Sequence, residues 1–125
     1  MRVLLAEDDA LLREILCEGL VDEGFAVVAV ENGAIALARF TADGPFDVLL
    51  VDEEMPGLTG RELLRRLRRD GHGVPAVLIS GNLHLEPDEC AALGVGPVLR
   101  KPISFEDLVR AVRALAEAPR PPGRV

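Results

Sequence analysis

Four short stretches of the chain carry side chains whose chemistry would combine into one site. They supply three carboxylates, one hydroxyl and one ammonium, in the order Glu7, Asp8, Asp52, Ser80 and Lys101. Three converging carboxylates repel one another, and one divalent cation with one ammonium would restore neutrality. Mg²⁺ suits such a site because it takes hard carboxylate oxygens and keeps positions for phosphate oxygens. These residue types therefore predict a magnesium-assisted site at which an aspartate attacks phosphorus.

Lys101 is the only lysine among the 14 basic residues of the chain, and all the others are arginines. An ammonium is a compact point charge, whereas a guanidinium is a planar fork with a different geometry. With the Ser80 hydroxyl, this ammonium is a suitable donor to the oxygens of a phosphoryl group.

Five short apolar runs alternate with amphipathic stretches and predict the strands that position these residues. The runs are Val3–Ala6, Ala26–Val30, Val48–Val51, Val74–Ile79 and Val95–Leu99. They are near-continuously apolar, which is typical of strands covered on both faces. Five repeats of strand then helix predict a parallel sheet with right-handed crossovers and helices on both faces. Because function gathers beyond the carboxyl ends of such strands, the acids, hydroxyl and lysine are expected to meet there.

The helices between the strands are expected to bury apolar stripes. In the first, the stripe is formed by Leu11, Leu12, Ile15, Leu16 and Leu20. Further helices are expected at about Gly33–Ala42, around the leucines of 61–69, from Pro87 to near Gly94, and at 105–116. Thr59 with Glu62 and Ser104 with Asp107 form capping-box patterns. On the last helix, we expect the ion pairs Glu106–Arg110 and Arg113–Glu117.

Composition limits the class of protein. The 125 residues include 21 acidic and 14 basic side chains, a net charge of −7, and 49% are hydrophobic, which suits one folded domain. The negative charge disfavours direct binding to nucleic acid. No apolar run approaches the roughly 18 residues that span a membrane, and Glu7-Asp8-Asp9 interrupts the opening one. We therefore expect a cytoplasmic protein without a membrane partner, in which Cys17 and Cys90 are reduced thiols.

The motifs, taken in order, resemble the receiver domain of bacterial two-component response regulators. They are Glu7-Asp8, the run from Asp52 through Glu53-Glu54-Met55-Pro56-Gly57-Leu58-Thr59-Gly60, Leu78-Ile79-Ser80-Gly81, and Leu99-Arg100-Lys101-Pro102. The resemblance extends from Arg2 to about Ala118. It implies an α/β fold, a (βα)5 doubly wound parallel five-stranded sheet with flavodoxin-like strand order 2-1-3-4-5. Residues 1–118 would form the receiver domain, and 119–125 a Pro-rich disordered tail or linker remnant.

The resemblance also implies a role for each site residue. Asp52 would accept a phosphoryl group from a sensor histidine kinase or a histidine phosphotransfer protein. Glu7, Asp8 and Asp52, with the backbone carbonyl of Glu54, would hold Mg²⁺. Ser80 and Lys101 would bind the phosphoryl oxygens, and a shift would follow in the face formed by helix four, strand five and helix five. This face would control a downstream protein or a covalently linked output domain. The chain would catalyse only its own phosphorylation and dephosphorylation, so it is not expected to be an enzyme otherwise.

Two positions, Val98 and Glu7, depart from the family pattern. Glu7 replaces the more frequent Asp at the first acidic position and still supplies a metal-side carboxylate. Val98 stands where the family often has an aromatic switch residue, and Glu54 and Asn82 flank the path of a water that attacks the aspartyl phosphate. Glu54 and Asn82 are thus expected to tune its lifetime. Val98 motivates an alternative function, a pseudo-receiver interaction module that works without phosphorylation. A phosphatase of the haloacid dehalogenase kind is disfavoured, because Glu54 stands where that chemistry needs a second aspartate.

Other polar residues have simpler interpretations. Asp9 is expected to act only at the helix start, His72 and His84 to be solvated loop residues, and Cys17 to pack. The Arg61–Arg69 cluster is expected to be a solvated helix face that could also meet an acidic partner.

Overall fold

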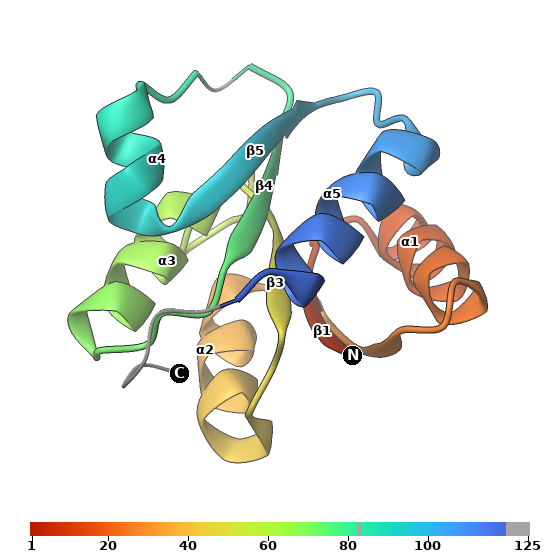
Figure 1. The fold of residues 1–125 in the computed structure, drawn as a ribbon, viewed down its shortest axis with the longest axis horizontal. Coiled ribbons are helices and arrows are strands. Elements are labelled where there is room, and N and C mark those ends of the chain that lie inside the picture. The colour runs from red at the N-terminus through yellow and green to blue at the C-terminus, as the bar shows by residue number, and fades with distance from the viewer. Residues whose placement is uncertain (83, 120–125) are drawn as a thin grey trace.

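The computed structural model describes residues 1–82 and 84–119 and contains five strands and five helices in strict alternation (Figure 1). The strands are β1 (Arg2–Ala6), β2 (Ala26–Val30), β3 (Val48–Asp52), β4 (Ala76–Ser80) and β5 (Val95–Arg100). The helices are α1 (Ala10–Asp22), α2 (Gly33–Asp43), α3 (Gly60–Arg69), α4 (Pro87–Leu93) and α5 (Phe105–Glu117). All strand pairs are parallel, and the sheet order β2-β1-β3-β4-β5 confirms the predicted doubly wound fold. Of the predicted tail, residues 120–125 lie outside the described residues.

The helices cover the sheet in two groups (Figure 1). One core cluster joins α1 and α5 to the sheet through Leu16, Leu20, Leu108 and Val112. The other joins α2, α3 and α4 to the opposite face and includes Phe40, Leu63, Leu64, Leu67 and Leu93. The central strands β3 and β4 are buried along their whole length, as predicted, whereas the edge strands β2 and β5 are only half-buried. The last residues of the central strands therefore sit on a rigid support.

The predicted stripe of α1 is only partly correct. Leu16 and Leu20 are buried and Leu12 is half-buried, but Leu11 is 67% exposed and Ile15 is 53% exposed. The buried residues are four positions apart on one line down the helix. Leu11 and Ile15 each precede a member of that line by one position, which turns them about 100° away from the sheet. These two apolar side chains face solvent beside the carboxyl edge of the sheet.

The predicted helix starts are largely confirmed. Thr59 and Glu62 form the complete capping box of α3, and Asp9 caps α1 by accepting a hydrogen bond from the Leu12 amide at 3.1 Å. Ser104 caps α5 by accepting from the Asp107 amide at 3.2 Å. The Asp107 carboxylate, however, accepts from Arg110 at 3.0 Å, so it does not complete a capping box.

Both ion pairs predicted within α5 are wrong. Arg110 binds Asp107 rather than Glu106. Residues three and four positions earlier are both neighbours on a helix surface, so spacing alone does not decide between these two acids. Arg113 turns away from Glu117 and binds the Glu23 carboxylate at 3.2 Å while its guanidinium stacks over the Phe25 ring. The turn after α1 offers this arginine an aromatic face as well as a charge, which the surface of α5 does not.

The interpretation of the α3 arginines also needs correction. Arg65, Arg66 and Arg69 are exposed, as predicted for a solvated face. The Arg68 guanidinium instead donates to the Leu93 carbonyl at 2.7 Å and to the His72 carbonyl at 2.9 Å. Arg68 thus ties the end of α3 to the end of α4. His72 is half-buried rather than solvated, because its ring packs edge-on against Phe40 with centroids 4.8 Å apart.

The remaining simple interpretations hold. Cys17 is half-buried against the α1–α5 cluster, and Cys17 and Cys90 are both free thiols. His84 is exposed and lies 3.4 Å from a Glu86 oxygen. Among the residues described, no helix is long and apolar enough to cross a membrane.

Candidate functional site

The carboxyl edge of the sheet brings together the residues predicted to act on phosphorus. Asp52 and Ser80 are the last residues of β3 and β4, and Glu7 and Lys101 immediately follow β1 and β5. Backbone bonding continues past the strand ends: the Glu7 amide donates to Val30 at 3.1 Å, and the Lys101 amide donates to Ser80 at 3.0 Å. These backbones are therefore fixed by the sheet rather than by a mobile loop.

Three carboxyl groups form a tight cluster at this edge. Each of Glu7, Asp8 and Asp52 offers one oxygen, and these oxygens lie within 4.8 Å of one another. Glu7 and Asp52 are fully buried, whereas Asp8 is exposed. The spacing lets all three oxygens contact one cation. It confirms that acids far apart in the sequence converge.

The negative charge of the cluster is only partly balanced by hydrogen-bond donors. Oε2 of Glu7 accepts a hydrogen bond from the Asp9 amide at 3.1 Å. Its other oxygen, Oε1, is buried without a hydrogen-bond partner among the described residues. A buried carboxylate oxygen without a partner is costly, and a hard divalent cation would satisfy it. The residues present therefore fit a magnesium ion.

Burial and crowding change the protonation of the two buried acids. The pKa of Glu7 is raised to about 7, mainly by burial and additionally by the neighbouring Asp52, whereas the Asp9 amide and Lys101 lower it. Burial also raises the pKa of Asp52 above its usual value, against the lowering effects of Glu7 and Lys101. Without a cation, near neutral pH, the pair thus holds a proton that a metal would have to displace.

Lys101 is the cationic partner of Asp52. Its Nζ is 3.2 Å from Oδ2 of Asp52, and its side chain remains 31% exposed. Burial lowers the pKa of Lys101, but the charges of Asp52 and Glu7 outweigh this effect and raise the pKa. The ammonium is therefore charged and close enough to bind a group carried by Asp52.

Ser80 is in place but engaged with another residue. Its buried hydroxyl donates to Oε2 of Glu54 at 2.6 Å, and the Gly81 amide donates to Oε1 of Glu54 at 2.8 Å. The Asn82 amide donates to the Ser80 hydroxyl at 3.2 Å. The Glu54 backbone remains beside the cluster, because its amide donates to Asp52 at 3.3 Å. This contact between Glu54 and the β4–α4 loop has no signal in the sequence.

Val98 lies on the middle of β5, paired with Leu78, and packs half-buried against the core cluster of α2, α3 and α4. An aromatic residue is therefore not needed to fill this position. The role of Val98 in switching stays a prediction.

Two supporting features were missed in the sequence. The buried Glu53 accepts hydrogen bonds from the Arg61 amide at 2.8 Å and from its Nε at 3.0 Å, which fixes the β3–α3 loop. Gly60 permits a close approach, because a Cβ there would lie 2.9 Å from the Asp52 carbonyl oxygen and 2.7 Å from Leu78. Glu53 was hidden within an acidic run, and a glycine required by packing has no distinguishing local pattern.

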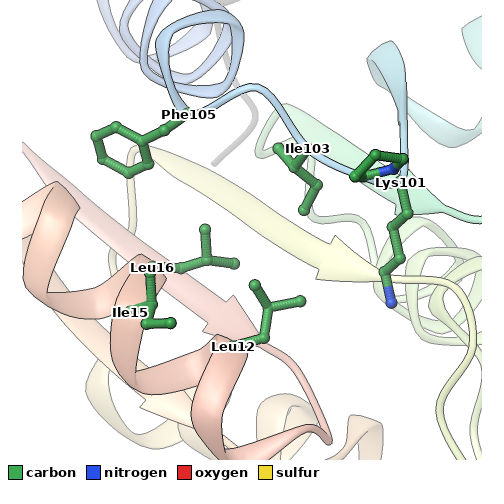
Figure 2. A pocket seen from close by; sticks show the side chains of 7 residues that line it. Leu12, Ile15, Leu16, Lys101, Ile103 and Phe105 are labelled. Atoms are coloured by element: carbon green, nitrogen blue, oxygen red, sulfur yellow. The ribbon is translucent and has the colours of Figure 1, made fainter.

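An apolar groove lies beside Lys101, whose ammonium contacts Asp52. Figure 2 shows the side chains that line this groove. The groove has a volume of about 270 Å³. Leu12, Ile15 and Leu16 of α1 form one side (Figure 2). Lys101 and Ile103 approach from the connection between β5 and α5, and Phe105 from the start of α5. Lys101 thus lines the groove with its aliphatic stem and reaches Asp52 with its ammonium.

Comparison with known proteins identifies the family. The sequence pattern of the response regulator receiver domain matches residues 3–113, nearly the whole described chain. The chain belongs to the response regulator receiver domain family. The fold, the strand order and the acidic cluster agree with this membership.

Curated relatives of this receiver domain are longer proteins. Response regulator MprA of Mycobacterium avium is 33% identical over 123 residues, which cover 97% of this chain and 53% of MprA. The alkaline phosphatase synthesis transcriptional regulatory protein SphR of Synechococcus elongatus is 33% identical over 124 residues, covering 91% of this chain and 48% of SphR. The receiver domain thus spans about half the length of these relatives.

Solved structures share its fold throughout. The receiver domain of a Francisella response regulator superposes with a TM-score of 0.83 at 26% identity, covering 93% of this chain and 96% of that chain. Response regulator TrrA of Thermotoga maritima, solved in complex with Mg²⁺ and BeF, superposes with a TM-score of 0.79 at 30% identity. The match covers 91% of this chain and 97% of the TrrA chain.

Proposed function

We propose that this receiver domain is a phosphoacceptor switch whose acceptor is Asp52. The observation that carries the proposal is the environment of this one carboxyl group. Asp52 is fully buried, shares a cluster with Glu7 and Asp8, and lies 3.2 Å from the ammonium of Lys101. A purely structural acid at a strand end would need only one cationic partner. Here the excess of negative charge fits a site built for a cation and a phosphoryl group.

In the proposed reaction, an oxygen of Asp52 attacks the phosphorus of a phosphohistidine on a partner protein. The new bond joins this oxygen to phosphorus, the phosphorus–nitrogen bond breaks, and the imidazole leaves with the electron pair. Lys101 neutralises charge on the phosphoryl oxygens, and the Ser80 hydroxyl donates to one of them. The sheet holds the backbones of these three residues in fixed relative positions, which favours the in-line approach.

Glu7, Asp8 and Asp52 would hold Mg²⁺, together with the backbone carbonyl of Glu54. When bound, the ion would offset the charge that builds up on the transferring group. The crowded carboxylates and the buried oxygen of Glu7 support this assignment. The TrrA structure, with its Mg²⁺ and BeF, gives a precedent in a relative.

The output would pass through the face formed by α4, β5 and α5. Ser80 ends β4 and leads into the connection to α4, so its movement towards a phosphoryl group would reach this face first. The controlled partner would be a downstream protein or a linked output domain, which is supported by the greater length of relatives named as response and transcriptional regulators. The setting would be the cytoplasm, without direct contact to nucleic acid, and the chain would catalyse only its own phosphorylation and dephosphorylation.

Acetyl phosphate, a small phosphodonor, provides the direct test. The native protein incubated with acetyl phosphate and Mg²⁺ should gain the mass of one phosphoryl group, measured by intact-mass spectrometry. A chelator should prevent the gain. If the native protein gains no mass with Mg²⁺ present, the phosphoacceptor function is wrong.

A pseudo-receiver interaction module is the second candidate. It is favoured by Val98 and by the engagement of the Ser80 hydroxyl with Glu54. The two functions differ in the response of backbone amide NMR signals on α4 and β5 to beryllofluoride, a stand-in for a phosphoryl group. A switch should show shifts on this face, whereas a module should bind the probe without them.

The apolar groove is a suitable docking place for the phosphodonor protein. It is lined by Lys101, whose ammonium lies 3.2 Å from Asp52. Ile15 of its lining and the nearby Leu11 are exposed apolar side chains. A helix that carries the phosphohistidine could therefore bury its apolar face on α1 while its imidazole reaches Asp52.

Ile15→Glu should slow phosphotransfer from such a protein by about tenfold or more, because the charge disrupts a central apolar contact. The measurement uses an autophosphorylated sensor kinase that transfers phosphate to the native chain. Val21→Glu is the matched control, since Val21 is 51% exposed on the same helix but one to two turns further from the site. Phosphorylation by acetyl phosphate should be unchanged in both variants. Equal slowing in both would exclude this groove.

A further inference from the structure

Glu54 holds the two donors that open the β4–α4 loop. One oxygen of its carboxylate accepts from the Ser80 hydroxyl at 2.6 Å and the other from the Gly81 amide at 2.8 Å. Both distances lie within the range of strong hydrogen bonds to an anion. A single carboxylate therefore fixes the side chain of one residue and the backbone of the next.

Glu54 is also tethered next to the acceptor. It follows Asp52 by two residues, and its amide donates to Oδ1 of Asp52 at 3.3 Å. Its charge contributes to the raised pKa of Lys101, which places the carboxylate within electrostatic reach of that ammonium as well. The Glu54 carboxylate thus lies among the groups that would surround a phosphoryl group carried by Asp52.

A hydroxyl has a single proton to donate. A phosphoryl group on Asp52 that recruits the Ser80 hydroxyl must therefore take it from Glu54. When this bond breaks, the carboxylate loses one of its two anchors on the loop and also meets a new negative charge nearby. Both effects favour its withdrawal from Gly81 as well.

We propose that Glu54 is a positioning residue that competes with the phosphoryl group for Ser80 and Gly81, and so holds the β4–α4 loop in its resting arrangement. This inference rests on the proposed function of Asp52 and adds a defined competitor to it. The competition lowers the affinity of the site for the phosphoryl group, because part of its binding free energy is used to displace Glu54.

A double-mutant cycle tests the competition with beryllofluoride and Mg²⁺ as the probe. The affinity is measured by calorimetry for the native protein, Glu54→Ala, Ser80→Ala and the double variant. Glu54→Ala should bind beryllofluoride about five- to tenfold more tightly, as expected for removal of a charged hydrogen-bond competitor. In the Ser80→Ala background the gain should fall to about twofold, because the contested hydroxyl is gone. The backbone carbonyl of Glu54 is retained in every variant.

Glu31→Ala controls for charge at this edge of the sheet, since Glu31 is exposed and directly follows β2. It should leave the affinity unchanged. In the free protein, the Gly81 amide signal should move in Glu54→Ala and stay in place in Glu31→Ala, which a general loss of stability would not produce.

An equal gain in both Ser80 backgrounds would show that Glu54 acts only by charge repulsion, and would overturn the inference. So would an unchanged affinity in Glu54→Ala while acetyl phosphate still labels the native protein. If none of the proteins binds beryllofluoride and the native protein also gains no mass from acetyl phosphate, the proposed function fails together with the inference.

Discussion

Asp52→Asn is expected to abolish phosphorylation by acetyl phosphate and to stabilise the metal-free protein at pH 8. The amide cannot form the acyl phosphate, so no mass gain should remain. The same change removes one of two fully buried carboxylates from the cluster. The amide oxygen can still accept a hydrogen bond from Lys101 or from the Glu54 amide. Relief of the repulsion should add about 1–3 kcal/mol to the free energy of unfolding in the presence of a chelator.

Asp9→Asn is the matched control for this variant. Asp9 lies at the same edge but acts as the N-cap of α1, a role that Asn fills equally well. This variant should be phosphorylated like the native protein and should keep its stability. Intact-mass spectrometry and urea denaturation measure the two quantities. A mass gain in Asp52→Asn equal to that of the native protein would place the acceptor elsewhere.

The metal-free protein is expected to lose stability as the pH rises from about 4.5 to 7. The pKa of Glu7 is about 7 in the folded protein and 4.5 in the unfolded chain, so the folded state binds more protons between these values. Stability that depends on this proton is complete below 4.5 and is lost as the pH rises through 7. The loss is about 2–3 kcal/mol for Glu7, and the raised pKa of Asp52 acts in the same direction.

Mg²⁺ should reverse this trend, because the ion binds the deprotonated carboxylates and stabilises only the folded state. Urea denaturation at pH 5, 6, 7 and 8, with Mg²⁺ or with a chelator, gives the four pairs of curves needed. The stabilisation by Mg²⁺ should grow with pH and shrink in Glu7→Gln. Glu14→Gln, a change at an exposed position of α1, should behave like the native protein. A metal-free stability that rises from pH 5 to 7 would contradict the assignment of the raised pKa values.

The sequence was sufficient to predict where the acids, the hydroxyl and the lysine meet. In a parallel sheet, strand order and strand ends determine which residues share an edge. The apolar runs marked the strand ends, and the resemblance to receiver domains implied the strand order. Thus Asp52 and Lys101, which come from opposite halves of the chain, could be predicted to lie together. Nζ of Lys101 is 3.2 Å from Oδ2 of Asp52. The helix starts could also be predicted from the sequence, because a cap such as Thr59 bonds to a residue only three positions away.

The wrong or missing predictions concern contacts between side chains of different helices, strands and loops. Arg113 could choose between Glu117 on its own helix and Glu23 beyond another, and only the packed structure shows that Phe25 decides the choice. The bond from Ser80 to Glu54 joins the end of β4 to the β3–α3 loop, so spacing in the sequence carries no trace of it. Leu11 and Ile15 show a further limit, because an apolar pattern does not reveal where the edge of a stripe lies.

The link from Arg68 determines how α4 can move. Its guanidinium holds the final carbonyl of α4 at 2.7 Å, whereas within the described residues no side chain caps the first turn, at Glu86. One end of this short helix is thus clamped, and the other follows the loop that starts at Ser80. A displacement of the loop after Ser80 would therefore rotate α4 about its C-terminal end, at Leu93, rather than translate the helix along the sheet. The largest displacement would then fall at the helix tip nearest the active edge.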